Sequence, residues 1–348
     1  MEKLNNNVNQ GLKMKSSIKV SQSQFMLSAV EVKTMRSILR QAQDDQETKL
    51  IFQPLIRINR CFLALVILGI TVSNSFAGGP WVQQKGKGYY KLSEWWIVFD
   101  QHYTSAGLID PNVTTGIYNT FLYTEYGLSD RLTGIVNASV FSRNYMNNLV
   151  SKTTGDVLVK GEGLNSIGDI DVELKYGLTK PGSSWTLAGS LTLGLPTGKK
   201  VGGELNNLQT GDGEFNQMMT LHAGRGLASI GNVASYISSY VGVNNRTQQF
   251  SEELRYGLEY GIGIADRKIW LVGRLIGIES LKNGATAENI TSTSIFANNT
   301  EFTSFSAEAI VYVSEKVGLS ASFASAFKGE IIAAAPSYSV GVFFDATK

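Results

Sequence analysis

The stretch Trp185–Leu195, with the sequence WTLAGSLTLGL, decides the fold. Its side chains alternate between apolar residues and small or hydroxylated ones. Because successive side chains of a β-strand point to opposite faces, this alternation predicts a strand with one apolar face and one polar face. About ten residues is also the length that a tilted strand needs to cross a membrane. The apolar face carries Trp185, Leu187, Gly189, Leu191, Leu193 and Leu195, and the other face carries Thr186, Ala188, Ser190, Thr192 and Gly194.

The same alternation recurs after residue 78. In Gly168–Tyr176, one face carries mainly aliphatic residues and the other a row of charged ones. In Glu253–Ile264, one face carries leucine, tyrosine and isoleucine and the other carries charged residues and glycine. One apolar and one polar face at this length is the pattern of transmembrane β-strands. Extending the pattern predicts twelve strands, at residues 88–99, 115–127, 131–142, 168–178, 185–195, 213–225, 232–243, 253–264, 268–279, 302–313, 317–327 and 337–345.

The predicted connections alternate in length. Short periplasmic turns and long outer loops are typical of up-and-down outer-membrane barrels. We therefore predict an all-β fold, a transmembrane up-and-down antiparallel β-barrel, with both ends of the barrel chain on the short-turn side. The alternative is a soluble β-sandwich or lipocalin-like barrel, which would turn its apolar face inward. The short connections are 128–130, 179–184, 226–231, 265–267 and 314–316, and the long ones are 100–114, 143–167, 196–212, 244–252, 280–301 and 328–336.

Composition agrees with a membrane barrel. Charged residues make up 17% of the 348 residues, against roughly 25% in soluble domains. The mean hydropathy of −0.03 is too low for several membrane helices, and an apolar content of 43% with a net charge of +2 argues against disorder. Because there is no large positive excess, no nucleic-acid partner is expected, and outer-membrane lipid is the expected surrounding.

Prolines and aromatic residues support the predicted strands. The five prolines after residue 78 fall outside them, as expected because proline cannot donate to a strand ladder. Aromatic residues collect beside the short turns, where an interfacial girdle requires amphipathic rings. The prolines are Pro80, Pro111, Pro181, Pro196 and Pro336, and the predicted girdle is Tyr126, Tyr176, Trp185 and Trp270.

The chain before the predicted barrel has a different character. A basic flank precedes the short apolar run 61–70, and small residues follow it. This three-part pattern predicts a signal peptide at residues 54–77, cleaved between Ala77 and Gly78, and export to the bacterial outer membrane. The polar stretch 1–53 is unusual for the basic end of a signal, and we interpret it as a leader produced by a start codon assigned too far upstream.

Five short motifs carry a resemblance to a known family. They are GKGYYKLSEW at 86–95, EYGLSDRL at 125–132, GDIDVELKYGL at 168–178, LGLPTG at 193–198 and TGDGEF at 210–215. With these motifs the sequence resembles the bacterial outer-membrane transporter-like barrels often labelled with the MetA pathway of phenol degradation. The resemblance covers most of 86–345 and implies transport of small, hydrophobic or aromatic compounds, with no catalytic residue. The chain departs from many outer-membrane barrels in ending on Asp345-Ala346-Thr347-Lys348 rather than on an aromatic residue.

The strand faces opposite the apolar ones are expected to point into the lumen. Their charges predict either a hydrated path with a weak cation preference or a set of pairs that fills the lumen. Inward glycines, Gly194, Gly257, Gly261 and Gly263, are expected to leave space. The lumen-lining candidates are Glu125, Asp169, Asp171, Glu173, Lys175, Glu253, Arg255, Glu259 and Arg274.

Catalytic and metal sites are not expected. The two histidines, His102 and His222, lie in no recognisable nucleophile arrangement. Acidic residues at every second position of 169–173 are too far apart for a compact calcium shell. The only cysteine, Cys61, lies in the predicted signal, so no thiolate site is expected in the barrel. No cofactor or metal is therefore predicted.

Three functional hypotheses follow from this sequence. The first is an outer-membrane channel or transporter for small, hydrophobic or aromatic solutes. The second is a non-conducting binding or structural barrel that acts through its outer loops, 143–167 and 280–301. The third and most remote is a barrel hydrolase that uses His222 or His102. The solute, the openness of the lumen and the oligomeric state stay open.

Overall fold

The computed structural model describes residues 79–348, apart from 181, 205 and 286–295. The predicted leader and signal peptide, with the cleavage site between Ala77 and Gly78, lie outside the described residues. Within the described ranges, no helix is long and apolar enough to cross a membrane.

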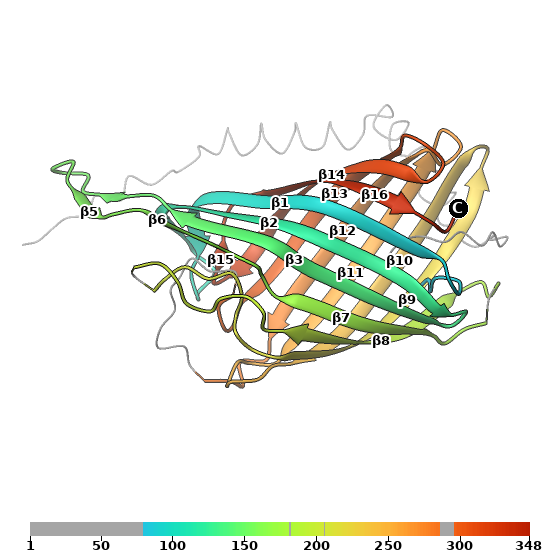
Figure 1. The fold of residues 1–348 in the computed structure, drawn as a ribbon, viewed down its shortest axis with the longest axis horizontal. Coiled ribbons are helices and arrows are strands. Elements are labelled where there is room, and N and C mark those ends of the chain that lie inside the picture. The colour runs from blue at the N-terminus through green and yellow to red at the C-terminus, as the bar shows by residue number, and fades with distance from the viewer. Residues whose placement is uncertain (1–78, 181, 205, 286–295) are drawn as a thin grey trace, which may run out of the picture. The chain divides into compact units, whose positions relative to one another are not determined.

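Twelve antiparallel strands form one closed sheet (Figure 1). The first strand pairs with the last, from Tyr89 opposite Asp345 to Ile97 opposite Ser337. Because this pairing removes the free edges, the sheet meets the requirement for a membrane-spanning barrel, and the predicted twelve-stranded fold is confirmed. The barrel strands are β1 (Gly88–Tyr103), β2 (Ile109–Ser129), β3 (Leu132–Met146), β7 (Ile170–Gly177), β8 (Thr186–Leu195), β9 (Asn216–Ile230), β10 (Val233–Asn245), β11 (Glu253–Ile264), β12 (Ile269–Ser280), β13 (Glu301–Tyr312), β14 (Val317–Glu330) and β16 (Ser337–Asp345).

Four short strands lie at the end where the long loops gather. The pair β4 (Leu149–Val150) and β5 (Val157–Val159) forms a hairpin of its own that projects from the barrel. β6 (Glu162–Ser166) and β7 both pair with β3, and β15 (Ile332–Ala333) pairs with the far end of β1. We call this end the long-loop end. The opposite end, with the C-terminus and the tight connections, is the short-turn end (right in Figure 1).

The first connection differs from the prediction. β2 begins at Ile109, so only 104–108 separate it from β1, where a long loop over 100–114 was expected. Pro111 consequently lies inside β2, opposite Gln101, although all five prolines were expected outside the strands. A bulge between Phe99 and Gln101 shifts the ladder beside it, which is where a sheet tolerates a residue without an N–H group.

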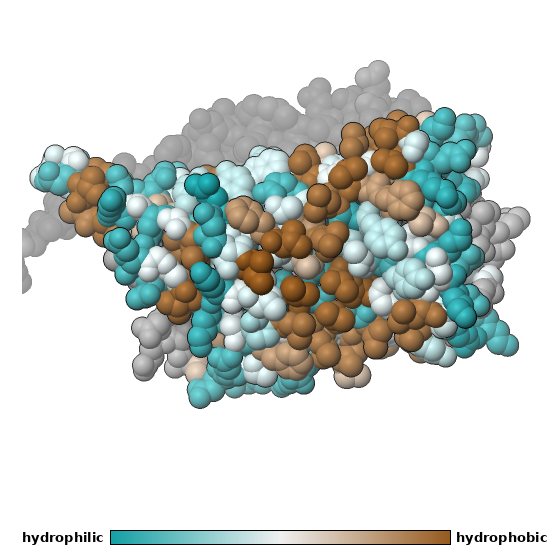
Figure 2. Space-filling view, in the orientation of Figure 1, coloured by the Kyte–Doolittle hydropathy of each residue, from teal (hydrophilic) through white to brown (hydrophobic). Residues whose placement is uncertain are grey.

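The outer wall is apolar. Leu258 and Tyr260 of β11 are 47% and 43% exposed, whereas Glu259 between them has only a 20% exposed side chain, on the other face. Figure 2 shows apolar residues across the middle of the visible wall and hydrophilic residues at both ends. Exposed apolar patches of this extent are rare on soluble monomers and normal where lipid covers the wall.

The inward glycines do not leave open space, contrary to expectation. A Cβ atom at Gly257 would overlap the Tyr240 ring, and one at Gly263 would lie 2.7 Å from the Trp270 ring. Aromatic side chains thus cover glycines of the neighbouring strand, an arrangement that stabilises curved sheets. Trp270, which was predicted in the girdle, is only 7% exposed and packs with Tyr236 inside the barrel. Its position relative to Arg274, four residues on in the same strand, places both on the inward face.

Candidate functional site

The lumen carries a network of ion pairs at mid-height. Arg274 of β12 donates to Glu259 of β11 (Nε to Oε2, 2.5 Å) and to Glu308 of β13 (Nη1 to Oε2, 2.7 Å). Lys91 of β1 reaches the other oxygen of Glu308 at 2.8 Å. Two strands, β14 and β16, lie between β1 and β13 in the sheet, so the last pair bridges the inner surface. We call these four residues the mid-lumen network.

A second cluster lies at the long-loop end. Arg246 of the loop 246–252 donates to Glu253 (2.6 Å), to Asp212 (3.3 Å) and to Glu214, and its guanidinium lies 4.5 Å from the Phe250 ring centre. Three carboxylates therefore surround one cation. Burial raises the pKa of Glu214 to about 7, because desolvation outweighs the attraction of Arg246. Arg255 adds a bond of 2.6 Å to Glu253 from the lumen side.

The acidic row on β7 divides into two roles. Asp171 is exposed to water inside the barrel, and Glu173 accepts a hydrogen bond from Thr192 at 3.3 Å, with Lys175 4.0 Å away. Asp169, before the strand, instead accepts the backbone N–H groups of Gly198 (2.9 Å) and Asp212 (3.0 Å). Its burial raises the pKa of Asp169 to about 6. Asp169 therefore holds the loop 196–215 and does not join the lumen row with which it was predicted.

At the short-turn end, the segment before β1 enters the barrel. Glu125 of β2 is completely buried and accepts hydrogen bonds from Gln83 Nε2 (2.6 Å) and the Tyr123 hydroxyl (2.5 Å). The backbone N–H of Gln83 also donates to Thr133 Oγ1 of β3 at 2.8 Å. We call Gly79–Lys87 the N-terminal segment. Sequence reasoning found Glu125 but not its partner, because nothing in a short irregular segment indicates which distant strand it contacts.

Nearer the long-loop end, part of the inward face of β1 and β2 is apolar. Ile97 and Phe99 of β1 pack with Ile117 of β2, and all three are almost fully buried. Ala333 and Ala335, from the connection between β14 and β16, lie against this cluster with Trp95. The inward face of β1 therefore carries Lys91 of the mid-lumen network and, further along the strand, a buried apolar cluster.

The described residues contain one hydroxyl–imidazole pair on the inward face. Ser190 Oγ lies 3.0 Å from His222 Nε2, and the Tyr240 ring flanks the imidazole at 6.1 Å between ring centres. In the described part of the chain, no hydrogen bond from the His222 ring to a carboxylate is found, so the third group that orients a catalytic base is missing there. In the same part, no three His, Cys, Asp or Glu side chains are placed to hold a metal ion.

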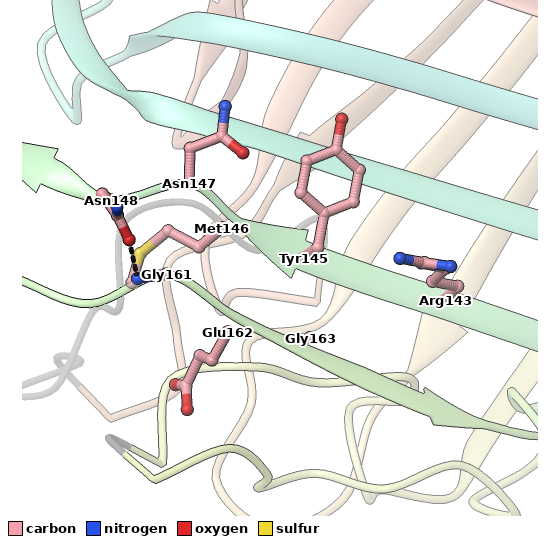
Figure 3. Close-up of a pocket in the computed structure, with 8 residues that line it drawn as sticks. All are labelled: Arg143, Tyr145, Met146, Asn147, Asn148, Gly161, Glu162 and Gly163. Atoms are coloured by element: carbon pink, nitrogen blue, oxygen red, sulfur yellow. Dashed lines mark hydrogen bonds between the residues drawn. The ribbon is translucent and has the colours of Figure 1, made fainter.

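A pocket of about 560 Å³ lies beside the β3–β6 extension at the long-loop end. Asn148 Oδ1 accepts the Gly161 N–H at 2.6 Å and fixes the backbone there. Figure 3 shows that Tyr145 of β3 and Glu162 of β6 project away from each other. Because its polar side chains do not converge, this pocket is a weaker candidate for solute binding than the lumen.

The sequence-predicted girdle and lumen residues take distinct positions. Tyr126, Tyr176 and Trp185 are 45%, 46% and 48% exposed on the outer wall near short turns. Seven of the predicted lumen residues form hydrogen bonds or ion pairs with other side chains inside the barrel. They are Glu125, Glu173, Lys175, Glu253, Arg255, Glu259 and Arg274. Lys91 and Glu308 were missed, although the alternation of 88–99 and 302–313 places both on inward faces. Arg246 lies in a loop, where no alternation exists to place it.

Comparisons with known proteins point to one fold. No protein-family model matches the chain, and no curated protein matches it significantly. Among solved structures it is similar to the COG4313 outer membrane channel from Pseudomonas putida F1, with a TM-score of 0.50 and 17% identity over 78% of this chain and 99% of that one. The KdgM porin in complex with disordered oligogalacturonate covers 74% of this chain and 98% of its own, at 7% identity and a TM-score of 0.40. The beta domain of the Bordetella autotransporter BrkA gives a TM-score of 0.43 at 13% identity over 74% of this chain and 99% of its own. At these identities the likeness concerns the fold, and the chain has the fold of an outer-membrane β-barrel.

Proposed function

We propose that this barrel is an outer-membrane channel through which small solutes diffuse. The observation that carries the proposal is the partial hydration of the lumen charges: the side chains of Arg255 and Arg274 are 33% and 28% exposed although both point inward. A lumen filled along its length by side chains would dehydrate and fully pair such groups, since an unhydrated charge is costly to hold. The inward charges instead pair along the wall and keep contact with water.

The inward side chains suggest the class of solute. Trp95, which is partly buried on the inward face beside the apolar cluster, offers a ring surface, and the mid-lumen network offers charges to a polar group. A small molecule with an aromatic or aliphatic body and a polar end matches these two kinds of side chain. This agrees with the transport of hydrophobic or aromatic compounds that the family resemblance implies.

Ion preference follows from the balance of inward charges. Acidic inward side chains outnumber basic ones, so the lumen has a negative potential that attracts cations. We expect a weak cation preference, because most of the acids are paired with a neighbouring Lys or Arg. The acidic residues are Glu125, Asp171, Glu173, Glu253, Glu259 and Glu308, and the basic ones are Lys91, Lys175, Arg255 and Arg274.

Single-channel recording in a planar bilayer tests the proposal. The wild-type barrel should conduct, and Glu259→Gln and Arg255→Gln should shift the reversal potential in a salt gradient in opposite directions. Lys328→Gln is the matched control, because Lys328 pairs with Glu279 at 3.5 Å on the outer wall and is 57% exposed. A barrel that inserts and shows no conductance, or selectivity unchanged by both lumen variants, would contradict the channel.

One observation favours the second candidate, a non-conducting barrel that acts through its loops. The β4–β5 hairpin projects from the long-loop end (Figure 1), and its Val157 and Leu158 are 53% and 63% exposed. Apolar side chains on a projecting hairpin suit contact with another surface. If this contact is the function, wild-type barrels should show no conductance. The double variant Val157→Ser with Leu158→Ser should then abolish binding to the other surface.

A further inference from the structure

We propose that the N-terminal segment is a plug that closes the short-turn end of the channel, and that it must dissociate from the inner wall of the barrel before solutes pass. This inference rests on the proposed channel function. The segment contacts strands on opposite sides of the barrel, and its contacts lie at the ends of these strands next to the short turns.

The first set of contacts between the segment and the wall is with β2 and β3. Gln83 is 2% exposed, and its side chain and backbone donate to Glu125 and Thr133, both completely buried. The next turn is pinned by backbone hydrogen bonds from Gly86 N to Gly127 O and from Gly127 N to Lys87 O, each 2.9 Å. Any side chain at Gly127 would overlap the Gln84 carbonyl, so the wall is shaped for the close approach of this backbone.

The second set of contacts is across the lumen, with β9, β10 and β12. The Trp81 ring contacts Tyr236 of β10 edge-on at 5.4 Å and packs against the buried cluster that includes Trp270 of β12. Pro80 is fully buried, and a Cβ atom at Gly224 of β9 would lie 2.7 Å from its Cγ. In the order of the sheet, β2 and β12 are separated by five steps in one direction and seven in the other, so they face each other across the ring.

The segment therefore lies inside the mouth, between the strands that its two ends contact. Val82, between the two anchors, lies against β7: a Cβ atom at Gly177 would be 3.3 Å from Val82 Cγ2. A chain in extended form with its side chains is about 10 Å across, which obstructs much of a lumen intermediate between filled eight-stranded and open sixteen-stranded barrels.

The contacts also indicate how the plug is released. The contacts described above that hold the segment are hydrogen bonds and side-chain packing, with no covalent or metal link among the described residues. Such contacts are reversible, unlike the continuous ladder that closes the wall from Tyr89 to Ile97. Opening thus removes the segment and leaves the barrel intact.

A disulfide lock tests the plug in the full chain. We would introduce Val82→Cys and Gly177→Cys in a Cys61→Ser background, since a Cβ at position 177 lies within bonding range of the Val82 side chain. Oxidation should abolish opening events in planar-bilayer recordings, and a reductant should restore them in the same protein. The control pair is Leu258→Cys with Leu275→Cys, directly opposed on the outer wall, for which both redox states should conduct equally.

Two release variants complete the test. Deletion of residues 80–84 should raise single-channel conductance by about twofold or more, because the obstruction at a narrow mouth is removed. Trp81→Ala with Gln83→Ala should raise the open probability even where the deletion fails to fold. Equal conductance in locked, released and wild-type proteins would overturn the plug and leave the channel standing. No conductance in any protein, including the deletion, would overturn the channel and the plug together.

Discussion

The mid-lumen network makes a quantitative prediction about stability. Arg274→Gln removes the only bond found here between Arg274 and Glu259 and one of the two that hold Glu308. Each charge-assisted hydrogen bond contributes roughly 1.5–3 kcal/mol when it is buried. Both contributions need discounting, because the Arg274 side chain is 28% exposed and that of Glu259 is 20% exposed, so water takes over part of the lost solvation.

Glu308 is less accessible to water than Glu259, so water replaces less of its lost interaction. Its side chain is 8% exposed, but Lys91 still neutralises it after the substitution. We therefore expect the free energy of unfolding to fall by about 2 kcal/mol, less than the 3–5 kcal/mol for breaking a fully buried pair. Cation preference should rise in the same variant, because the lumen loses a positive charge.

The assay is urea unfolding of the barrel in lipid vesicles, followed by the fluorescence of its tryptophans. Lys328→Gln is again the control, since it breaks an exposed pair and should leave the midpoint almost unchanged. A loss below about 0.5 kcal/mol for Arg274→Gln would refute the reasoning, because that is the range of ordinary surface substitutions. Equal losses for the two variants would show that the lumen screens charges as strongly as bulk water does.

Three further predictions concern other parts of the barrel. Trp270→Ala should lower the free energy of unfolding by roughly 3–5 kcal/mol in the same assay, because it empties an interior site and uncovers Gly263; a loss under about 1 kcal/mol would mean that the ring is not part of the interior packing. Because the pKa of Glu214 is raised to about 7, the folded loop binds a proton more tightly than the unfolded chain, so the loops 196–215 and 246–252 should lose stability as pH rises from about 4.5 to 7. Hydrogen exchange corrected for intrinsic rates measures this loss, and Glu214→Gln should reduce it and leave the smaller part due to Asp169, whose pKa is raised to about 6; a profile that is the same in both proteins would assign the pH dependence to another group. Gly224→Ala should raise conductance without unfolding the barrel, because a methyl group 2.7 Å from Pro80 Cγ displaces the N-terminal segment; unchanged recordings from a folded variant would contradict that displacement.

The strands could be predicted from sequence because a lipid-facing wall imposes a period of two on every segment. Trp185–Leu195 satisfies that period over its whole length, and the observed β8 differs from it by one residue. The prediction failed where another influence decided the position. Trp270 lies beside a short turn, as girdle residues do, yet its position in the alternation and the bare Gly263 beside it draw the ring inward.

The candidate site was only partly predictable. Alternation is a local signal, so it placed Glu259 and Arg274 on one face without telling which charges meet. Lys91 and Glu308 meet only because the barrel closes, and the partner of Glu125 comes from a segment that has no alternation at all. Asp169 continues the spacing of Asp171 and Glu173, but hydrogen bonds to the backbone of a distant loop decide its role.

The Lys91–Glu308 pair has a consequence for assembly. Glu308 and Arg274 belong to adjacent strands of one hairpin, so they can meet while the sheet is still open. Lys91 can reach Glu308 only after β1 has joined β16, two strands that are separated by more than two hundred residues of chain. The Lys91 ammonium group therefore forms this ion pair only when the ring closes. The pair then links the inner surface across the seam where the first and last strands meet. Reopening that seam would separate Lys91 from Glu308, so the ion pair adds a side-chain link to the backbone ladder that closes the ring.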